Sequence, residues 1–463
     1  MPSPYFATVS VVGSAVGTVV GSVVGLVLLT GMPAAVAQDS VALTLNAAWQ
    51  QTASRHPALH AASAAVQLAR SAADVAAIPL LPATLLSVGY QQTTANWVPR
   101  PGVLPKNLAA KSGQSSLDTY SFWQSSVDAR WLVTDFGRTR SAVAAADFAA
   151  DQQVAGGKAL RRQLWLQVAL AYCSVVAAEQ DALVAAQLRE LAVKRQQAVH
   201  ARVQARIRPA AELARADSDL AMAQLAVADG EQEIAAARQQ LTVAMAAPQP
   251  VVAELTAVTS TTDVPAYAQL AQPDAVQQWT EVASQRREEW AALQAQKSAV
   301  LAQLIANERA QLPSIFVGAS ASLQGTEVDG LVANAAIGGG IEWPAAALWQ
   351  ARPAATALHA QLRAIGAQQD VVCAQVRGHL DAARVALLQA SRRAPVLAAA
   401  LQAAQAAYDQ AQARYAAGAA VLVEVLDAAQ GLAAVKRDGV ATELRRAHAA
   451  VRWQAAIGAA PMD

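Results

Sequence analysis

The sequence SFWQSSVDARWLVT, residues 121–134, alternates in polarity with the period of two that is typical of a strand. One face carries apolar and aromatic side chains, with Trp123 and Trp131 near its ends, and the other face carries both charges, Asp128 and Arg130. Strands of an outer-membrane β-barrel have this length, an apolar outer face and aromatic ends. A half-buried antiparallel sheet alternates in the same way, so this stretch alone leaves both interpretations open.

Similar alternation recurs in residues 83–92, where it is less regular, and in 313–324 and 334–343. A Leu-Pro pair precedes each pair of segments and a long helical stretch follows it, which indicates an internal repeat of about 200 residues. Four strands cannot enclose a channel, whereas three copies of the chain would supply twelve. The joining loops, 94–120 and 325–333, would then face the outside of the cell.

The remaining sequence is rich in alanine, glutamine and arginine, residues that favour helices. Residues 137–205 and 210–247 contain no proline. A helix of ~65 residues spans roughly 100 Å and needs neighbours along its length. We therefore expect two antiparallel helical hairpins with turns at Pro209 and Gly418, and a proline-rich linker at 248–275.

The N-terminus has the features of an export signal. Residues 5–37 carry no charge, and Ala35 and Ala37 supply the small residues of a cleavage site. We expect cleavage after Ala37, although the lack of a basic residue leaves an uncleaved anchor as the alternative. No clean membrane-spanning helix is expected beyond the signal.

Composition argues against several other functions. The 35 basic and 34 acidic residues nearly cancel, so no nucleic-acid partner is expected. No motif for catalysis, nucleotides or zinc occurs, and the chain is expected to be neither an enzyme nor a cofactor-binding protein. Cys173 and Cys373 are expected to be buried and unpaired, with a disulfide between them as the alternative.

The expected fold is mainly α with a small β part, an internal duplication in which each chain adds four strands to a trimeric barrel. The expected segments are a signal peptide (1–37), a first helical segment (38–81), two strands with an outer loop (82–134), a long helical hairpin (135–247), the linker (248–275), a second helical segment (276–312), two strands (313–343), a second hairpin (344–458) and a tail (459–463).

Short motifs along the chain share one set of relatives. Residues 43–45 and RHPAL at 55–59 are similar to an opening helix with an "NP-L" element, and WLVTDFG at 131–137 to a "W-x-x-F-D-x-G" strand-to-helix junction. YAAG at 415–418 and VEVLDA at 423–428 are similar to a "Y-x-x-G…V-D-V-L-D-A" helix tip. As a set, covering nearly the whole mature chain, these motifs resemble the TolC family of outer-membrane efflux and secretion channels.

The resemblance implies a homotrimer in the outer membrane, with a twelve-stranded barrel in lipid and a helical tunnel through the periplasm. It implies partners as well: a periplasmic adaptor (membrane fusion protein) and an inner-membrane transporter of the ABC or RND type. The chain would be the exit channel of a tripartite efflux pump or a type I secretion system. The alternative is a periplasmic coiled-coil adaptor or scaffold, which leaves the repeated hairpins unexplained.

The resemblance also implies roles for residues at the helix tips. Glu424 and Asp427 match acids that line the periplasmic aperture, and Tyr415 and Glu212 match residues of a latch. From the sequence alone, Glu424 and Asp427 project from a helix opposite an apolar stripe, which an ordinary solvated face would also do. The turns themselves are the expected adaptor contacts: Arg206, Ile207, Arg208, Gly418 and Ala419.

Three positions depart from the family pattern. Arg206 stands where the first tip would have its glycine, and Ala420 stands where the latch would have its arginine. The second strand-to-helix junction, WPAAA at 343–347, lacks the "F-D-G" element. The first two departures concern how the aperture closes and how an adaptor docks.

Overall fold

A computed structural model describes residues 43–94, 119–251, 255, 266–272 and 274–459. The expected signal peptide and its cleavage site lie outside these residues, as do residues 95–118 of the first outer loop, half of the linker and nearly all of the tail. Every structural statement below concerns the described part of the chain.

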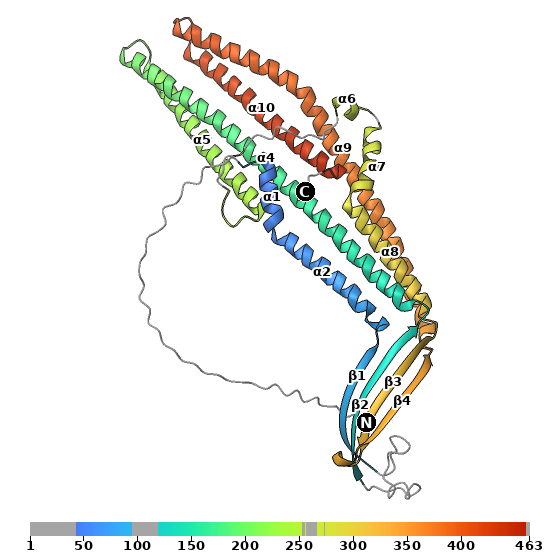
Figure 1. The fold of residues 1–463 in the computed structure, drawn as a ribbon. Coiled ribbons are helices and arrows are strands. Elements are labelled where there is room, and N and C mark those ends of the chain that lie inside the picture. The colour runs from blue at the N-terminus through green and yellow to red at the C-terminus, as the bar shows by residue number, and fades with distance from the viewer. Residues whose placement is uncertain (1–42, 95–118, 252–254, 256–265, 273, 460–463) are drawn as a thin grey trace, which may run out of the picture. The chain divides into compact units, whose positions relative to one another are not determined.

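Four strands form one antiparallel sheet in chain order (Figure 1). They are β1 (Ala83–Thr94), β2 (Thr119–Thr134), β3 (Ser314–Gly325) and β4 (Val332–Glu342). The register places Val127 of β2 opposite Leu86 of β1 and Ala321 of β3. The two hairpins therefore lie side by side and present one continuous face, as the expected mainly helical fold with a four-stranded contribution requires.

Matching tryptophans tie each hairpin to the segment that precedes it. Trp131 Nε1, near the end of β2, donates a hydrogen bond of 3.0 Å to the Leu80 carbonyl. Trp343 Nε1, just after β4, donates one of 2.9 Å to the Gln311 carbonyl. Each acceptor lies two residues before the proline that opens the hairpin, at Pro82 and Pro313. The same contact at the same relative position supports the internal duplication.

The first repeat surrounds one long helix. Its elements are α1 (Leu45–Arg55), α2 (Pro57–Ala77), the 3₁₀ turn η1 (Ile78–Leu80), α4 (Arg138–Gln204) and α5 (Ala210–Met245). His56 separates α1 from α2, and its Nδ1 accepts a hydrogen bond of 3.2 Å from the Ala58 N–H. His56 thus caps α2 in the manner of Asn, with Pro57 at the first helical position.

The second repeat has a similar order, with one additional short helix and with its 3₁₀ turn between the two strands and not before them. Its elements are α6 (Tyr267–Leu270), α7 (Ala275–Arg286), α8 (Glu288–Arg309), the 3₁₀ turn η2 (Val328–Gly330), α9 (Ala347–Ala416) and α10 (Leu422–Ile457). The short helix α6 lies inside the segment that we expected to be a proline-rich linker. The 70-residue α9 accommodates Pro353 and Pro395.

The first strand-to-helix junction is fixed by a buried carboxylate. Asp135 accepts hydrogen bonds from the backbone N–H of Gly137 at 3.1 Å and of Thr139 at 2.7 Å, and from the Thr139 hydroxyl at 2.5 Å. Burial by itself raises the pKa of Asp135, but these bonds and Arg138 outweigh it and lower the pKa. Gly137 has φ +88°, which a side chain would strain. The "D-x-G" of the motif therefore has a structural reason.

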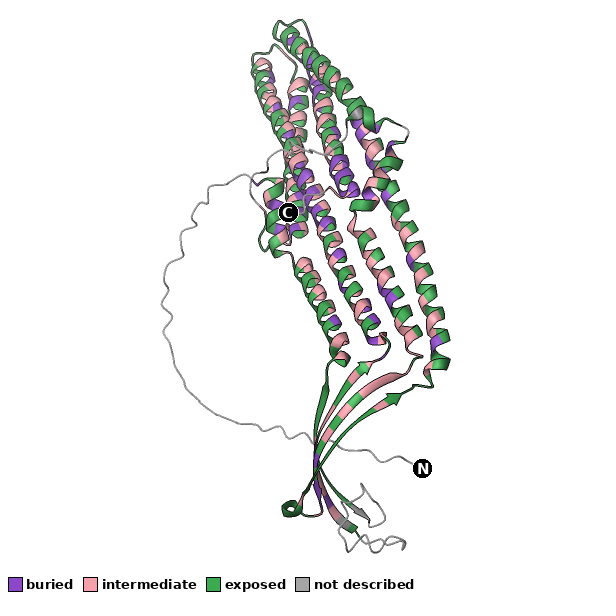
Figure 2. Ribbon diagram, turned by 45° about the vertical axis from the view of Figure 1, so that its right-hand side comes forward, coloured by how far each residue is buried: buried purple, intermediate pink, exposed green. Residues whose placement is uncertain are grey.

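The helices pack side by side, with buried side chains gathered in two zones (Figure 2). One zone lies at the middle of α4, where Val168, Tyr172 and Val175 contact α1 and α5. Among the described helices α4 alone is long and apolar enough to cross a membrane, a test of length and composition that a buried core helix also passes. A second correction concerns the cysteines: both are free, but Cys373 is exposed and only Cys173 is buried.

Candidate functional site

The two hairpin turns at the free ends of the long helices have the same backbone geometry. In the first, the N–H groups of Arg206 and Ile207 bond to the carbonyls of Val203 and Arg202, both at 2.9 Å. In the second, Gly418 and Ala419 bond to Tyr415 and Arg414 at 3.1 and 2.9 Å. Both patterns are the Schellman motif, a helix ending in which one residue takes a positive φ.

Arg206 and Gly418 occupy this left-handed position, with φ +56° and +77°. The arginine therefore substitutes for glycine without changing the turn, at a cost of about 1 kcal/mol. All of the residues expected to contact an adaptor lie in these turns, and four of the five are exposed: Arg206, Ile207, Gly418 and Ala419. Arg208 is the exception, because its side chain is only 24% exposed.

An apolar cluster joins the two hairpins just behind their turns. Tyr415 of α9 is buried there together with Val199 of α4, Ala216 of α5 and Val425 of α10. The stripe of α10 that the sequence predicted is buried in this region, including Leu426, Ala429 and Leu432. The tips of the two hairpins are therefore packed against each other within one chain.

Arginines of the first hairpin surround the expected latch tyrosine. The guanidinium carbon of Arg202 lies 4.4 Å from the centroid of the Tyr415 ring, and that of Arg208 lies 6.0 Å from it. Both fall within the range of cation–π attraction. Arg208 Nη1 also lies 3.5 Å from Glu212 Oε1. Arg208 thus stands between the two residues that we expected to form the latch.

The expected hydrogen bond between Tyr415 and Glu212 is not formed within the described chain. Tyr415 Oη and Glu212 Oε2 are both buried and have no hydrogen-bond partner there. Arg208 lies two residues after Arg206, as Ala420 lies two residues after Gly418. The arginine that position 420 lacks is therefore present at the matching position of the first tip.

The acids of the second tip differ from each other in their surroundings. Glu424 and Asp427 are both exposed and lie opposite the buried stripe of α10, as the sequence predicted. Glu424 Oε2, however, forms an ion pair of 3.2 Å with Arg414 Nη1 of α9. Asp427 forms no ion pair among the described residues. The structure therefore provides one paired and one unpaired carboxylate at this tip.

The sheet presents the apolar face that the alternation predicted. Leu86 is 70% exposed, Val127 50% and Ile337 83%, and all lie on the same face with Trp131 and Trp343. The polarity of the first strand alternates less regularly because the apolar Leu85 lies on the opposite, polar face, beside Asp128. An exposed apolar face of this extent on a single chain indicates an apolar environment or a partner surface.

The other face of the sheet is polar and internally bonded. Ser126 accepts or donates a bond of 2.8 Å with Ser87 and donates one of 2.7 Å to Asp128. Arg130 pairs with Glu342 at 2.5 Å and lies 3.7 Å from the centroid of Phe316. The sheet thus has one face suited to lipid and one suited to water.

Sequence reasoning missed the arginines that organise the tips. Arg202 and Arg414 each lie four residues before the left-handed position of their turn, and Glu212 and Glu424 each lie six residues after it. This repeated Arg/Glu spacing was visible in the sequence. The partner of each side chain was not visible, because it depends on how the two hairpins pack.

The comparisons with known proteins agree with this geometry. Residues 48–247 match the model of the outer membrane efflux protein family. No curated protein sequence matches the chain. Solved structures do: the outer-membrane channel OprN (18% identity, 90% of this chain and 91% of that one, TM-score 0.74) is among them.

Two further structures have the same fold. The Campylobacter jejuni outer membrane channel CmeC is 15% identical over 90% of this chain and 86% of its own, with TM-score 0.70. The Neisseria gonorrhoeae outer membrane channel MtrE, solved in an open state, is 19% identical over 89% and 88%, with TM-score 0.72. The first half of the chain thus resembles the outer membrane efflux protein family, and the described chain has the fold of these outer-membrane channels.

Proposed function

We propose that three copies of this chain form the exit channel of a tripartite assembly, which passes cargo from an inner-membrane transporter across the periplasm and the outer membrane. The sheet is the observation that carries the proposal. Its four strands have one apolar and one polar face, and twelve such strands in three chains close a barrel that faces lipid outside and water inside. The transporter is of the ABC or RND type, and an adaptor joins it to the helix tips.

The lipid-facing assignment is tested at neighbouring positions of the sheet. Val127→Arg should destabilise the protein folded in the membrane by about 2–4 kcal/mol, because it places a charge on the apolar face. Ser320→Arg is the matched control, since position 320 lies on the polar face directly opposite Asp128. Ser126 is a poorer control than the sequence suggested, because its hydroxyl is bonded on both sides. Equal effects of Val127→Arg and Ser320→Arg on assembly would contradict the proposal.

The adaptor contact is tested by cysteine cross-linking in cells. The exposed Cys373 is first replaced by alanine, which leaves only the buried Cys173 as a background thiol. Cysteines at Arg206 or Ala419, both exposed in the turns, should then cross-link to a periplasmic adaptor. Cysteines at Phe136 and Leu348, exposed at the sheet-proximal ends of the long helices, serve as controls. Cross-linking at the controls alone would place the partner at the wrong end.

The aperture role is tested by the conductance of purified trimers in planar bilayers. A ring of three carboxylates favours cations, and divalent cations added on the tip side should block such a ring. Asp427→Ala should reduce cation selectivity and block more than Glu424→Ala does, because Arg414 already neutralises Glu424. Arg414→Gln should strengthen the block. If all three variants keep the wild-type selectivity and block, Glu424 and Asp427 are a solvated face outside the pore.

A further inference from the structure

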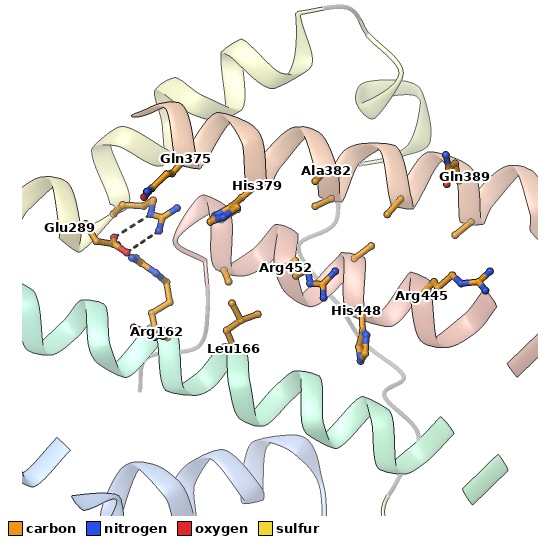
Figure 3. Close-up of a pocket in the computed structure, with 18 of the residues that line it drawn as sticks. Arg162, Leu166, Glu289, Gln375, His379, Ala382, Gln389, Arg445, His448 and Arg452 are labelled. Carbon is orange, nitrogen blue, oxygen red and sulfur yellow. Dashed lines mark hydrogen bonds and ion pairs between the residues drawn. The ribbon is translucent and has the colours of Figure 1, made fainter. Parts of the chain in front are cut away.

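A cavity lies where α10 ends and α8 begins, between the long helices α4 and α9 (Figure 3). Its volume is ≈ 700 Å³, which is within the range of pockets that hold small molecules. All four helices that line it belong to the same chain. It lies near the middle of α4, well separated in sequence from the helix tips and from the sheet.

The cavity is strongly basic. Five arginines line it against the single carboxylate of Glu289: Arg162, Arg287, Arg393, Arg445 and Arg452. Two of the five are neutralised, since Arg162 pairs with both Glu288 and Glu289, and Arg287 Nη2 lies 2.8 Å from Glu289 Oε1. Burial raises the pKa of Glu289, but hydrogen bonds from Arg287 and Arg162 outweigh it and hold the pKa at about 2. This carboxylate is therefore ionised, and both of its oxygens already accept hydrogen bonds from arginines.

The other three arginines have no acidic partner in the described chain. No ion pair forms at Arg393, Arg445 or Arg452 there. In addition, the Arg287 side chain is only 13% exposed, and its Nη1 atom is buried without a hydrogen-bond partner in the described chain. Buried guanidinium donors are normally satisfied, so this atom adds an uncompensated positive group behind the wall of the cavity. Figure 3 shows Arg445 and Arg452 extending from α10 along the cavity.

Between these charges much of the wall of the cavity is apolar, although Gln375, His379 and His448 also line it. It is built from Leu166 of α4 and from small side chains of α9 and α10, such as Ala382, Ala386 and Ala455. An inorganic anion would use only the guanidinium groups. A ligand that also carries a hydrocarbon or aromatic body would cover the alanine surface as well and gain from its burial.

We propose that this cavity binds small organic anions, molecules with a carboxylate, sulfonate or phosphate group attached to an apolar body. The anionic group lies between the unpaired guanidinium groups of Arg445 and Arg452, and the apolar body lies against the alanines of α9. Binding here requires neither the aperture acids nor the sheet, so it is independent of the channel function proposed above.

Calorimetric titration of the purified full-length protein in dodecyl maltoside micelles tests the proposal. The probe is naphthalene-2-sulfonate, with 2-naphthalenemethanol as an uncharged counterpart that has the same ring system and with micelles alone as the blank. One site per chain is expected for the sulfonate. The uncharged probe should bind at least about tenfold more weakly, because charge-assisted hydrogen bonds contribute that much.

Two variants on α10 identify the site. Arg445→Gln/Arg452→Gln should weaken sulfonate binding about tenfold or more while leaving 2-naphthalenemethanol unchanged. Arg446→Gln is the matched control, because Arg446 is adjacent in sequence but pairs with Glu443 and does not line the cavity. Both arginines of the double variant are exposed, so the trimer should migrate as wild type. The proposal is overturned if the sulfonate does not bind, if both probes bind equally, or if the double variant keeps wild-type affinity.

Discussion

The turn between α4 and α5 has Arg206 where the turn between α9 and α10 has Gly418, yet both turns close with the same pair of backbone hydrogen bonds. The two strand-to-helix junctions also differ in their side chains. Asp135 caps the first junction with three hydrogen bonds, whereas no side chain caps the start of α9. The tryptophan contacts, in contrast, are equivalent in the two repeats.

This difference teaches which parts of a duplicated chain remain constrained. Backbone geometry is shared because both hairpins must turn at the same place between helices of nearly equal length. Side chains diverge where one copy can supply what the other lacks. Arg208 of the first tip, for example, reaches both Glu212 of its own hairpin and Tyr415 of the second hairpin.

The largest expected effect is at the first strand-to-helix junction, which Asp135 caps. Asp135→Ala should lower the free energy of unfolding by about 2 kcal/mol, because it removes the cap and leaves buried donors of Thr139 unsatisfied. Urea titration of the detergent-solubilised protein measures this. Pro344→Ala at the second junction, where no capping carboxylate exists, should change the unfolding free energy by much less. Similar losses at both junctions would mean that the cap formed by Asp135 makes no difference to the free energy of unfolding.

The pH dependence of the same carboxylate follows from its lowered pKa. A carboxyl whose folded pKa is below its unfolded value contributes stability above the unfolded pKa and loses it as pH falls through the folded pKa. Asp135→Asn should therefore flatten the loss of stability on acidification below the ordinary carboxyl range. An unchanged acid profile would contradict this assignment.

The next effect concerns the tyrosine that only the second tip has. Tyr415→Leu should cost about 1–2 kcal/mol, because it removes the ring from the guanidinium groups of Arg202 and Arg208. Tyr415→Phe should cost almost nothing, since the hydroxyl has no partner in the described chain. The unfolding midpoints of the two variants decide between a ring contact and a hydroxyl latch, because a latch would make Phe as harmful as Leu.

The tryptophan contacts should respond equally. Trp131→Phe and Trp343→Phe each remove one hydrogen bond to a backbone carbonyl and should each cost about 1 kcal/mol. Heat-dependent migration of the protein in detergent gels reports the loss. A cost confined to one of the two would show that the repeats no longer share this contact in energetic terms.

The smallest effect is the exchange of the turn residues. Arg206→Gly should stabilise the chain by up to about 1 kcal/mol, because glycine adopts a positive φ without strain. Gly418→Arg should destabilise it by a similar amount. The two changes together should nearly cancel in the unfolding free energy, and stabilisation by Gly418→Arg would refute the equivalence of the two turns.

The sequence by itself determined the periodic features of the protein. Period two in residues 121–134 and 313–324 fixed which face of the sheet is apolar, since strand geometry leaves no other choice once the strand exists. Alanine-rich stretches predicted the long helices, although α9 contains Pro353 and Pro395, and the WLVTDFG motif predicted the first junction, which the local bonds of Asp135 hold. The exposed positions of Glu424 and Asp427 also followed from helical spacing.

Contacts between distant segments depended on the tertiary structure alone. The pairing of Arg414 with Glu424 and the position of Arg202 and Arg208 around Tyr415 depend on how four helices pack. The exposure of Cys373 depends on which face of α9 meets its neighbours. The basic cavity likewise arises because α10 ends where α8 begins, which brings arginines from far apart in the chain to one place. Periodicity specifies which face of an element is apolar, but the neighbour of each side chain is settled only by packing.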